Sequence, residues 1–365
     1  MWVSHPRLGW FAVSIATTRS VWQCGLTSRF GDSIDLSVLL SFNGVNRDLG
    51  EAMRVVSVIN FKGGVGKTTV TANLGAELAR RGKRVLLVDL DPQSSLTYSF
   101  YAPDMAAGRI PPDRSIKAWY DSFDRGLPNR ALSDCVVIPA EVNKKVQQYG
   151  GFVGLIPSSM SLIDHELSML ANVGLRGVEP GQELFRLRRA LSEALHHPAL
   201  AGYELVLIDC APNFNIVTQS AIVASDHVLV PSRPDYLSTL GITSLLHNKS
   251  RLVEMYNHQI AEFSPGKPVI APTELGVVFT MVQYKTVNPI RAHLHYMDLT
   301  QRRNPKLPIF KTSIRENVAF GSENPDGVPV ILRLKPQDKI YVELMALASD
   351  FLNSSGFVER AVAAA

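Results

Sequence analysis

The chain has 365 residues, of which 46% are apolar, and this is enough to bury one large hydrophobic core. Its formal net charge of +4 is only mildly basic, so charge permits contact with nucleic acid without indicating it. The three cysteines, Cys24, Cys135 and Cys210, have neither a paired nor a metal-ligand spacing, which argues against a disulfide framework and against a cysteine-bound cluster. No apolar run reaches the ~18 to 20 residues that span a bilayer, so no transmembrane helix is predicted.

Residues 1–52 show no sustained helical or strand period. They contain Trp2, Trp10 and Trp22, and a targeting peptide or a start codon assigned too far upstream would both be compatible with this composition. Met53 stands directly before the first predicted strand. We therefore expect a poorly ordered N-terminal extension over 1–52 and, because strand and helix patterns alternate afterwards, one α/β domain over 53–352.

A glycine-rich turn joins the first predicted strand to the first predicted helix. Residues 55–59 have the length and β-branched content of a buried strand, and residues 69–81 have apolar residues at helical spacing. Glycines let the backbone turn successive N–H groups inward, and the following helix adds the positive end of its dipole. The turn therefore predicts phosphate binding, and the alternative is a strand–helix turn with incidental lysines. It comprises Lys62, Gly63, Gly64, Val65, Gly66, Lys67, Thr68 and Thr69.

The turn departs from the common phosphate loop G-x-x-x-x-G-K-[ST], because Phe61 stands where the first glycine is expected. It matches instead the form K-G-G-x-G-K-[ST], in which a second lysine, Lys62, begins the loop. In a loop of this kind Lys67 reaches the β- and γ-phosphates of a nucleotide, and the Thr68 hydroxyl binds Mg²⁺.

Two further apolar strands end in carboxylates. The strand that begins at Arg84 is followed by Asp89 and Asp91, and the strand that begins at Glu204 is followed by Asp209. Such carboxylates lie where open α/β sheets bind ligands, although each one singly is more often a helix cap or a solvated loop residue. After a phosphate loop they predict a nucleotide site in which Asp209 holds Mg²⁺ through its water, as a Walker-B aspartate does.

These segments together resemble the ParA/MinD-type family of deviant-Walker P-loop ATPases, and within it the ParA partition branch. The resemblance spans about residues 53–351. It implies a three-layer α/β fold, the P-loop NTPase fold, with a mostly parallel twisted sheet flanked by helices. It also implies hydrolysis of ATP with Mg²⁺. The matching segments are 62–69, 85–93, 209–212 and 231–236, with a weaker match at 276–281.

The resemblance implies a role for individual residues. Lys67 contacts the phosphates, Lys62 reaches across the two-fold axis of a homodimer to the partner's ATP, and Asp91 positions the attacking water. Thr68, Asp89 and Asp209 surround Mg²⁺, directly or through its waters. The nucleotide-binding residues it implies are Gly63, Gly64, Val65, Gly66, Lys67, Thr68 and Thr69, with Pro231, Pro234 and Asp235 lining the adenine.

The remaining segments are less regular. Residues 101–151 form short amphipathic pieces interrupted by proline and glycine, at the position of the family's variable insert. A strand is predicted at 152–157 and an amphipathic helix at 183–197. The tail, 353–365, is predicted to be flexible, and it is too weakly amphipathic and too poor in lysine to anchor on lipid, so no membrane contact is expected.

The ParA branch implies binding to duplex DNA without sequence preference, a cytoplasmic, nucleoid-associated location, and a ParB-like or cargo-adaptor partner that stimulates hydrolysis. Lys285 falls where the family commonly places a DNA-contacting arginine, and Arg291 and Arg315 are further predicted contacts. A second family arginine is not reproduced, because Ala319 occupies its place. A charge cluster of this kind is otherwise a solvated face.

Two other functions stay open. A P-loop enzyme of the same superfamily could activate a small metabolite, as a dethiobiotin synthetase does, but this requires an additional polar pocket that the sequence does not identify. A MinD-like ATPase that acts at a membrane surface requires an amphipathic tail. Lys62 favours the dimer switch, because a signature lysine that acts on the partner's nucleotide belongs to dimerising members of the family.

Overall fold

The computed structural model describes residues 2–5, 9–12, 25–27, 33–35, 53–124, 130–171, 173 and 177–357. The chain divides into two compact units, Met1–Glu51 and Ala52–Ala365. In the first unit, β1 (Trp2–His5) pairs with β2 (Gly9–Ala12), and β3 (Gly25–Thr27) pairs with β4 (Ser33–Asp35), both antiparallel. The sequence pattern did not predict these strands. The rest of the extension expected to be poorly ordered lies outside the described residues.

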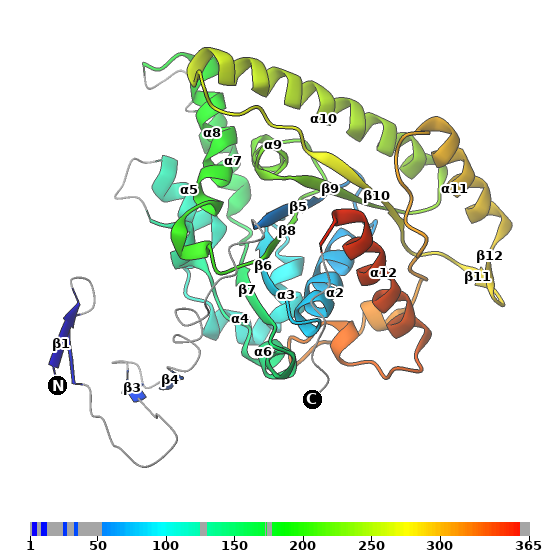
Figure 1. The fold of residues 1–365 in the computed structure, drawn as a ribbon, viewed down its shortest axis with the longest axis horizontal. Coiled ribbons are helices and arrows are strands. Elements are labelled where there is room, and N and C mark those ends of the chain that lie inside the picture. Colours follow the sequence, from blue (N-terminus) through cyan, green and yellow to red (C-terminus); the bar gives the residue numbers. More distant parts are fainter. Residues whose placement is uncertain are drawn as a thin grey trace. The chain divides into compact units, whose positions relative to one another are not determined.

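A six-stranded parallel sheet runs through the second unit in the order β10-β9-β5-β8-β6-β7 (Figure 1). The sheet and the helices on both of its faces confirm the predicted α/β fold class. The strands predicted near 55–59, 84–89, 152–157 and 204–209 are confirmed as well. The six strands are β5 (Arg54–Val58), β6 (Arg84–Asp89), β7 (Phe152–Ile156), β8 (Leu205–Asp209), β9 (His227–Ser232) and β10 (Thr273–Phe279).

The strand order reverses direction beside β5. The chain passes from β5 to β6 on one side, whereas β8 is followed by β9 on the other side of β5. Ligands of open α/β sheets bind outside the carboxyl ends of the strands at such a reversal. The register places Asp89 directly beside Asp209 across β6 and β8, so both acids lie at this edge.

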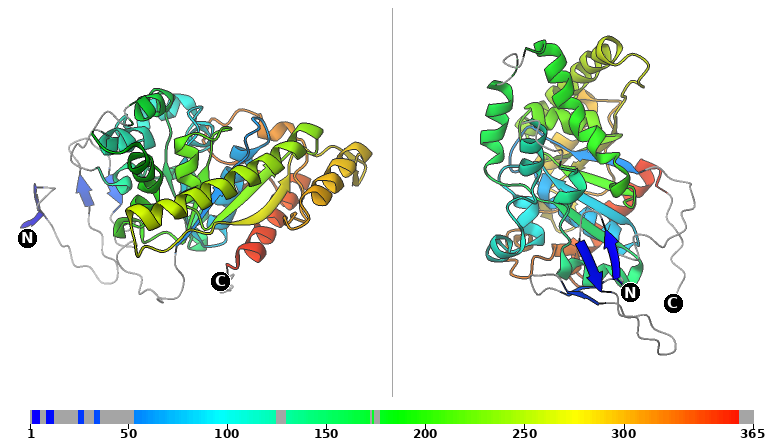
Figure 2. Two further views of the ribbon diagram at one scale, coloured as in Figure 1. Left: turned by 90° about the horizontal axis from the view of Figure 1, so that it is seen from above. Right: turned by 90° about the vertical axis from the view of Figure 1, so that its left-hand side faces the viewer.

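Helices cover both faces of the sheet, and this explains why its strands are apolar on both sides. α2 contacts the sheet on one face together with α12, while α9 and α10 contact it on the other, with α8 packed against them (Figure 1). Figure 2 shows α10 extending along the outside of the sheet towards α11. The helices are α2 (Lys67–Arg80), α3 (Ser95–Phe100), α4 (Pro103–Arg109), α5 (Ile116–Asp124), α6 (Ala140–Val146), α7 (Leu162–Ala171), α8 (Pro180–Leu195), α9 (Ile216–Ala224), α10 (Tyr236–Phe263), α11 (Arg291–Arg303) and α12 (Lys339–Ser355).

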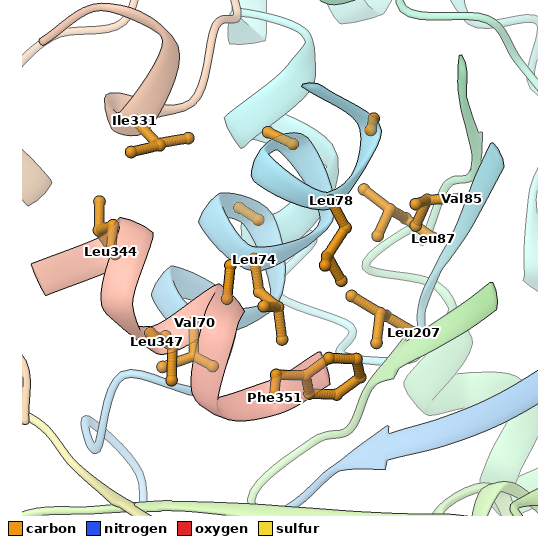
Figure 3. Packing of buried hydrophobic residues seen from close by; sticks show 14 of the residues in the cluster. Val70, Leu74, Leu78, Val85, Leu87, Leu207, Ile331, Leu344, Leu347 and Phe351 are labelled. Atoms are coloured by element: carbon orange, nitrogen blue, oxygen red, sulfur yellow. The ribbon is translucent and has the colours of Figure 1, made fainter. Parts of the chain in front are cut away.

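The main hydrophobic core surrounds α2 (Figure 3). Leu74 and Leu78 of α2 lie between the sheet residue Leu207 and the α12 residues Leu347 and Phe351, all of them fully or almost fully buried. Because α2 is held from both sides, its first turn is fixed at the carboxyl edge of β5. The core therefore positions the glycine-rich loop that precedes this helix.

α12 extends past residue 353, where the flexible tail was predicted to begin. α12 continues to Ser355, and Gly356 ends it in the left-handed conformation, with a φ of 68°. The Phe357 ring is 7% exposed, and its centroid lies 6.4 Å from that of Phe351. This aromatic pair packs directly after the helix, and residues 358–365, which make up most of the predicted tail, lie outside the described part.

The other predicted segments agree with the structure in outline. The insert at 101–151 contains the short helices α4, α5 and α6, and the helix predicted at 183–197 corresponds to α8. No helix among the described residues is long and apolar enough to cross a membrane.

Candidate functional site

The glycine-rich loop connects β5 to α2 with two residues in the left-handed region. Gly64 has a φ of 67° and Gly66, which caps α2, has a φ of 79°. A Cβ atom built on Gly63 or Gly64 would meet nothing within 4 Å, so the space outside this part of the loop is open. A loop of this form at the start of a helix can present backbone N–H groups to an anion.

Lys67 supplies a buried positive charge at the loop. Its Nζ donates to the carbonyl oxygens of Asn60, at 3.0 Å, and of Lys62, at 3.2 Å, and the residue is only 6% exposed. Burial lowers the pKa of Lys67, although the nearby Asp209 acts in the opposite direction. Among the described residues Lys67 forms no ion pair, so its ammonium group is suited to receive the charge of a phosphate.

Thr68 and Asp209 provide the oxygen atoms that Mg²⁺ prefers. The Thr68 hydroxyl donates to Asp209 Oδ2 at 2.7 Å, and the Thr71 hydroxyl donates to Asp209 Oδ1 at 3.3 Å. Burial raises the pKa of Asp209 to about 7, against the effect of the hydrogen bond from Thr68. This pair fits the predicted magnesium site, since a bound cation would offset the cost of burying the carboxylate.

The other two predicted acids differ in their surroundings. Asp89 is fully buried, and it accepts hydrogen bonds from the backbone N–H and the hydroxyl of Thr97, at 2.8 and 2.7 Å, and from the Asp91 N–H, at 3.1 Å. Burial, and next the charge of Asp209, raise the pKa of Asp89 to about 8. Asp89 therefore fixes the turn after β6, and Asp91 is the acid that lines the cavity at the loop.

A cavity of about 630 Å³ lies over the loop. Its lining includes residues 63–69 and Asp91 together with Met281, Phe320 and Val330. An adjoining cavity of about 320 Å³ shares Gly66, Thr69, Met281 and Phe320 with the first, and Ile314 and Leu344 make its wall more apolar. Together the two cavities offer a charged part beside an apolar part, as a nucleotide requires.

The residues predicted to line the adenine lie between the end of β9 and the start of α10. The cavities at the loop are not lined by Pro231, Pro234 or Asp235. Pro231 ends up buried at the end of β9, where its carbonyl accepts a hydrogen bond from Asn60 Nδ2 at 2.8 Å. Contact of Pro231, Pro234 and Asp235 with the adenine stays a prediction, and Met281 and Phe320 line both cavities at the loop.

Lys62 is held inside its own chain. Its Nζ lies 2.8 and 2.9 Å from the two carboxylate oxygens of Asp235 and 3.0 Å from the Ser238 hydroxyl. Although burial acts to raise it, the pKa of Asp235 is lowered by the hydrogen bonds from Lys62 and Ser238. The side chains of Lys62 and Asp235 are about one third exposed, so this ion pair is accessible from solvent. The predicted contact of Lys62 with a partner's nucleotide requires this pair to open.

Asn60 is a site residue that the sequence analysis did not identify. It is fully buried, its side-chain Oδ1 accepts from the Lys62 N–H at 3.0 Å, and its carbonyl accepts from Lys67 Nζ. It thus orients both lysines of the loop. The sequence feature that could have identified Asn60 is its position as a polar residue directly after an apolar strand.

The three predicted DNA contacts also differ. Lys285, in the short strand β11 (Tyr284–Lys285), and Arg291, at the start of α11, are exposed. The Arg315 guanidinium instead forms an ion pair with Glu343 at 2.6 Å and lies over the Tyr284 ring, 4.7 Å from its centroid. Contact of Arg315 with DNA stays a prediction, and it would require this ion pair to open.

Comparisons with known proteins show what this chain is similar to. A family model described as an AAA domain matches residues 53–262. The chromosome partitioning protein ParA of Myxococcus xanthus is 29% identical over 300 residues, which covers 80% of this chain and 86% of the relative.

Two solved structures share the fold. The McdA–ATP complex of Cyanothece has a TM-score of 0.59 at 16% identity, covering 85% of this chain and 98% of the other. Cobyrinic acid a,c-diamide synthase from Mycobacterium smegmatis, with a bound ATP analogue and magnesium, has a TM-score of 0.55 at 23% identity, covering 84% and 96%. Since the family model spans more than half of the chain and includes the glycine-rich loop, the chain belongs to this AAA domain family and is a ParA/MinD-type P-loop ATPase.

Proposed function

We propose that the protein is a ParA-type switch that binds ATP and Mg²⁺, dimerises in the ATP state, and hydrolyses ATP to ADP and phosphate. In the dimeric state it binds duplex DNA without sequence preference, and a ParB-like or cargo-adaptor partner stimulates hydrolysis. The switch thereby segregates a plasmid, a chromosome or another cargo on the nucleoid. The name of the Myxococcus xanthus relative supports the partition role.

The proposal depends on one observation: the two loop lysines, Lys62 and Lys67, differ in burial and in ion pairing. Lys67 is buried beside the loop without a carboxylate, whereas Lys62 is partly exposed and bound to Asp235. The first arrangement favours a phosphate held within the same chain. The second leaves a cation at the surface that can exchange Asp235 for the phosphates of a second protomer.

A small number of side chains at the loop is sufficient for the proposed hydrolysis of ATP. Bound ATP and Mg²⁺ would supply the phosphoryl group and neutralise the charge that develops on it. Lys67 holds the phosphates, and Thr68 and Asp209 hold the metal and its waters. Asp91, which faces the cavity, orients the attacking water, because the transition state for phosphoryl transfer needs positioning more than covalent chemistry.

An ATPase assay tests the proposal and separates it from metabolite activation. We expect slow hydrolysis by the full chain that rises when non-specific duplex DNA is added together with a partner protein encoded beside it. A metabolite-activating enzyme has no reason to respond to DNA. Hydrolysis that is unaffected by DNA and partner, in a protein that binds ATP, would leave the nucleotide assignment in place and reject the switch.

A further inference from the structure

Four cationic side chains are buried within the described ranges: those of Lys67, Lys83, Arg188 and Lys249. Lys83 and Lys249 each form an ion pair with a glutamate. Lys67 has no such partner and is the residue that we assign to the nucleotide phosphates. Arg188 is the other buried cation that forms no ion pair with a carboxylate among the described residues.

Arg188 lies on α8 and is 7% exposed. Its Nε donates to Gln219 Oε1 at 2.9 Å, and one terminal nitrogen donates to Gln259 Oε1 at 3.2 Å, so both acceptors are neutral amides. A guanidinium has five N–H donors, and the structure shows no acceptor among the described residues for the remaining three. Burial lowers the pKa of Arg188, with only the Tyr256 hydroxyl acting to raise it.

Arg188 forms part of the wall of a groove of about 720 Å³ between α8, α9 and α10, which we call the α8–α10 groove. Glu254 also lines this groove but forms no ion pair with Arg188. Met255, on the wall, is 39% exposed, so the groove is open to solvent. Its lining also includes the apolar Phe214 and Leu252 and the basic Arg251 and His258.

We propose that the α8–α10 groove binds a carboxylate group, with Arg188 as its main ligand. A buried charge is costly unless a counter-charge and hydrogen bonds offset it, and the protein itself supplies only the two amide bonds. The planar guanidinium matches the two oxygens of a carboxylate, and Arg251 adds a second positive charge to the lining of the groove. This site is independent of the nucleotide loop, so it does not rest on the proposed function.

Two sources can present a carboxylate to the groove, namely a small free dicarboxylate and an acidic side chain of a partner protein. Isothermal titration of the full chain, without nucleotide, with glutarate and separately with a hexaglutamate peptide distinguishes them. Chloride at equal ionic strength controls for general screening. Saturable binding of either probe supports the site and identifies its source, and the absence of binding by both probes overturns it.

Arg188→Met tests whether this residue is the ligand. We expect binding of the probe to weaken about tenfold or more, because a hydrogen-bonded charge pair is lost. The melting temperature without probe should stay equal or rise, since an unneutralised buried charge has been removed. Arg302→Met, which removes a highly exposed arginine of α11, should leave binding unchanged. Equal binding by Arg188→Met and wild type would refute the assignment.

Gln259→Glu provides a second test that does not depend on removing the arginine. It places a carboxylate at an atom that already accepts a hydrogen bond from Arg188. We expect a higher melting temperature and loss of probe binding, because the charge is then neutralised from within the chain. Gln301→Glu, at an exposed position of α11, adds the same charge away from the groove and should change neither property. Normal probe binding by Gln259→Glu would contradict the proposal.

Discussion

At the scale of single residues, the site depends on which charged groups already have partners. Lys67 is surrounded by carbonyl oxygens, whereas Asp89 has its oxygens occupied by Thr97 and the turn after β6. A charged group that has no counter-charge nearby is available to bind a ligand. A charged group whose hydrogen bonds are all made within the chain stabilises the fold instead. The same comparison favours Asp91 over Asp89 for the proposed role of positioning the attacking water.

Lys67→Ala should weaken ATP binding by about tenfold or more, because each hydrogen bond between a charged group and phosphate is worth about 1.5 to 3 kcal/mol. Titration of a fluorescent ATP analogue measures this change. The fold should survive, since the substitution removes a buried charge that forms no ion pair in the described structure. Lys306→Ala, at an exposed lysine, is the matched control. Unchanged affinity in Lys67→Ala would mean that the loop does not hold the phosphates.

Asp91→Ala should keep ATP affinity and lose hydrolysis, because the residue lines the cavity without contacting the loop lysines. The expected decrease in the hydrolysis rate is about 10²-fold, the lower end of the contribution of a group that directs proton transfer or water. Single-turnover release of phosphate measures it, and Asp104→Ala, at an exposed acid of α4, is the control. A normal rate would assign the positioning of water to another group.

At the scale of elements, the ion pair between Lys62 and Asp235 joins the loop after β5 to the start of α10. The two residues are 173 positions apart in the chain. Asp235 also caps α10, because its Oδ1 accepts a hydrogen bond from the Ser238 N–H at 2.9 Å. If Lys62 binds the partner's nucleotide, this contact opposes dimerisation, since each protomer must break one such pair.

Asp235→Asn should strengthen ATP-dependent dimerisation. Asparagine still caps the helix, so the change removes the ion pair and leaves α10 stable. A partly exposed pair is worth about 0.2 to 1 kcal/mol, so the expected gain is at most about fivefold for each protomer. Sedimentation with a nonhydrolysable ATP analogue measures the dimerisation constant. Weaker dimerisation would show that the Asp235 carboxylate itself supports the interface, and that breaking its ion pair with Lys62 does not favour the dimer.

The elements themselves were predictable because their signals are local. A strand, a glycine turn and a helix follow one another over residues 55–81, and each acid-terminated strand stands within one segment. The apolar cavity was not predictable in the same way, because Met281 and Phe320 come from separate loops that the fold brings together. The pairing of Arg315 with Glu343 on α12 is equally non-local.

At the scale of the whole molecule, the proposed binding to DNA depends on how the exposed positive charges are distributed over the surface. The net charge of +4 is too small to predict it, so the proposed binding would depend on where exposed cations gather in the proposed dimer. Lys285 and Arg291 are exposed near one another in sequence, on β11 and at the start of α11. The Arg315 guanidinium is paired with Glu343 and lies over the Tyr284 ring of β11. It therefore allows a paired cation to be compared with two exposed cations in the same region.

The salt dependence of DNA binding by the ATP-bound protein tests this distribution of charge. Each phosphate that a cation neutralises contributes about −0.9 to the slope of log affinity against log salt concentration. Lys285→Gln and Arg291→Gln should therefore each reduce the slope by about 2 in a dimer, where every contact occurs twice. Arg315→Gln should leave the slope unchanged, because Glu343 already neutralises that guanidinium. The reverse result, with Arg315→Gln alone reducing the slope, would mean that the ion pair opens on DNA and that the exposed cations of β11 and α11 are solvated surface.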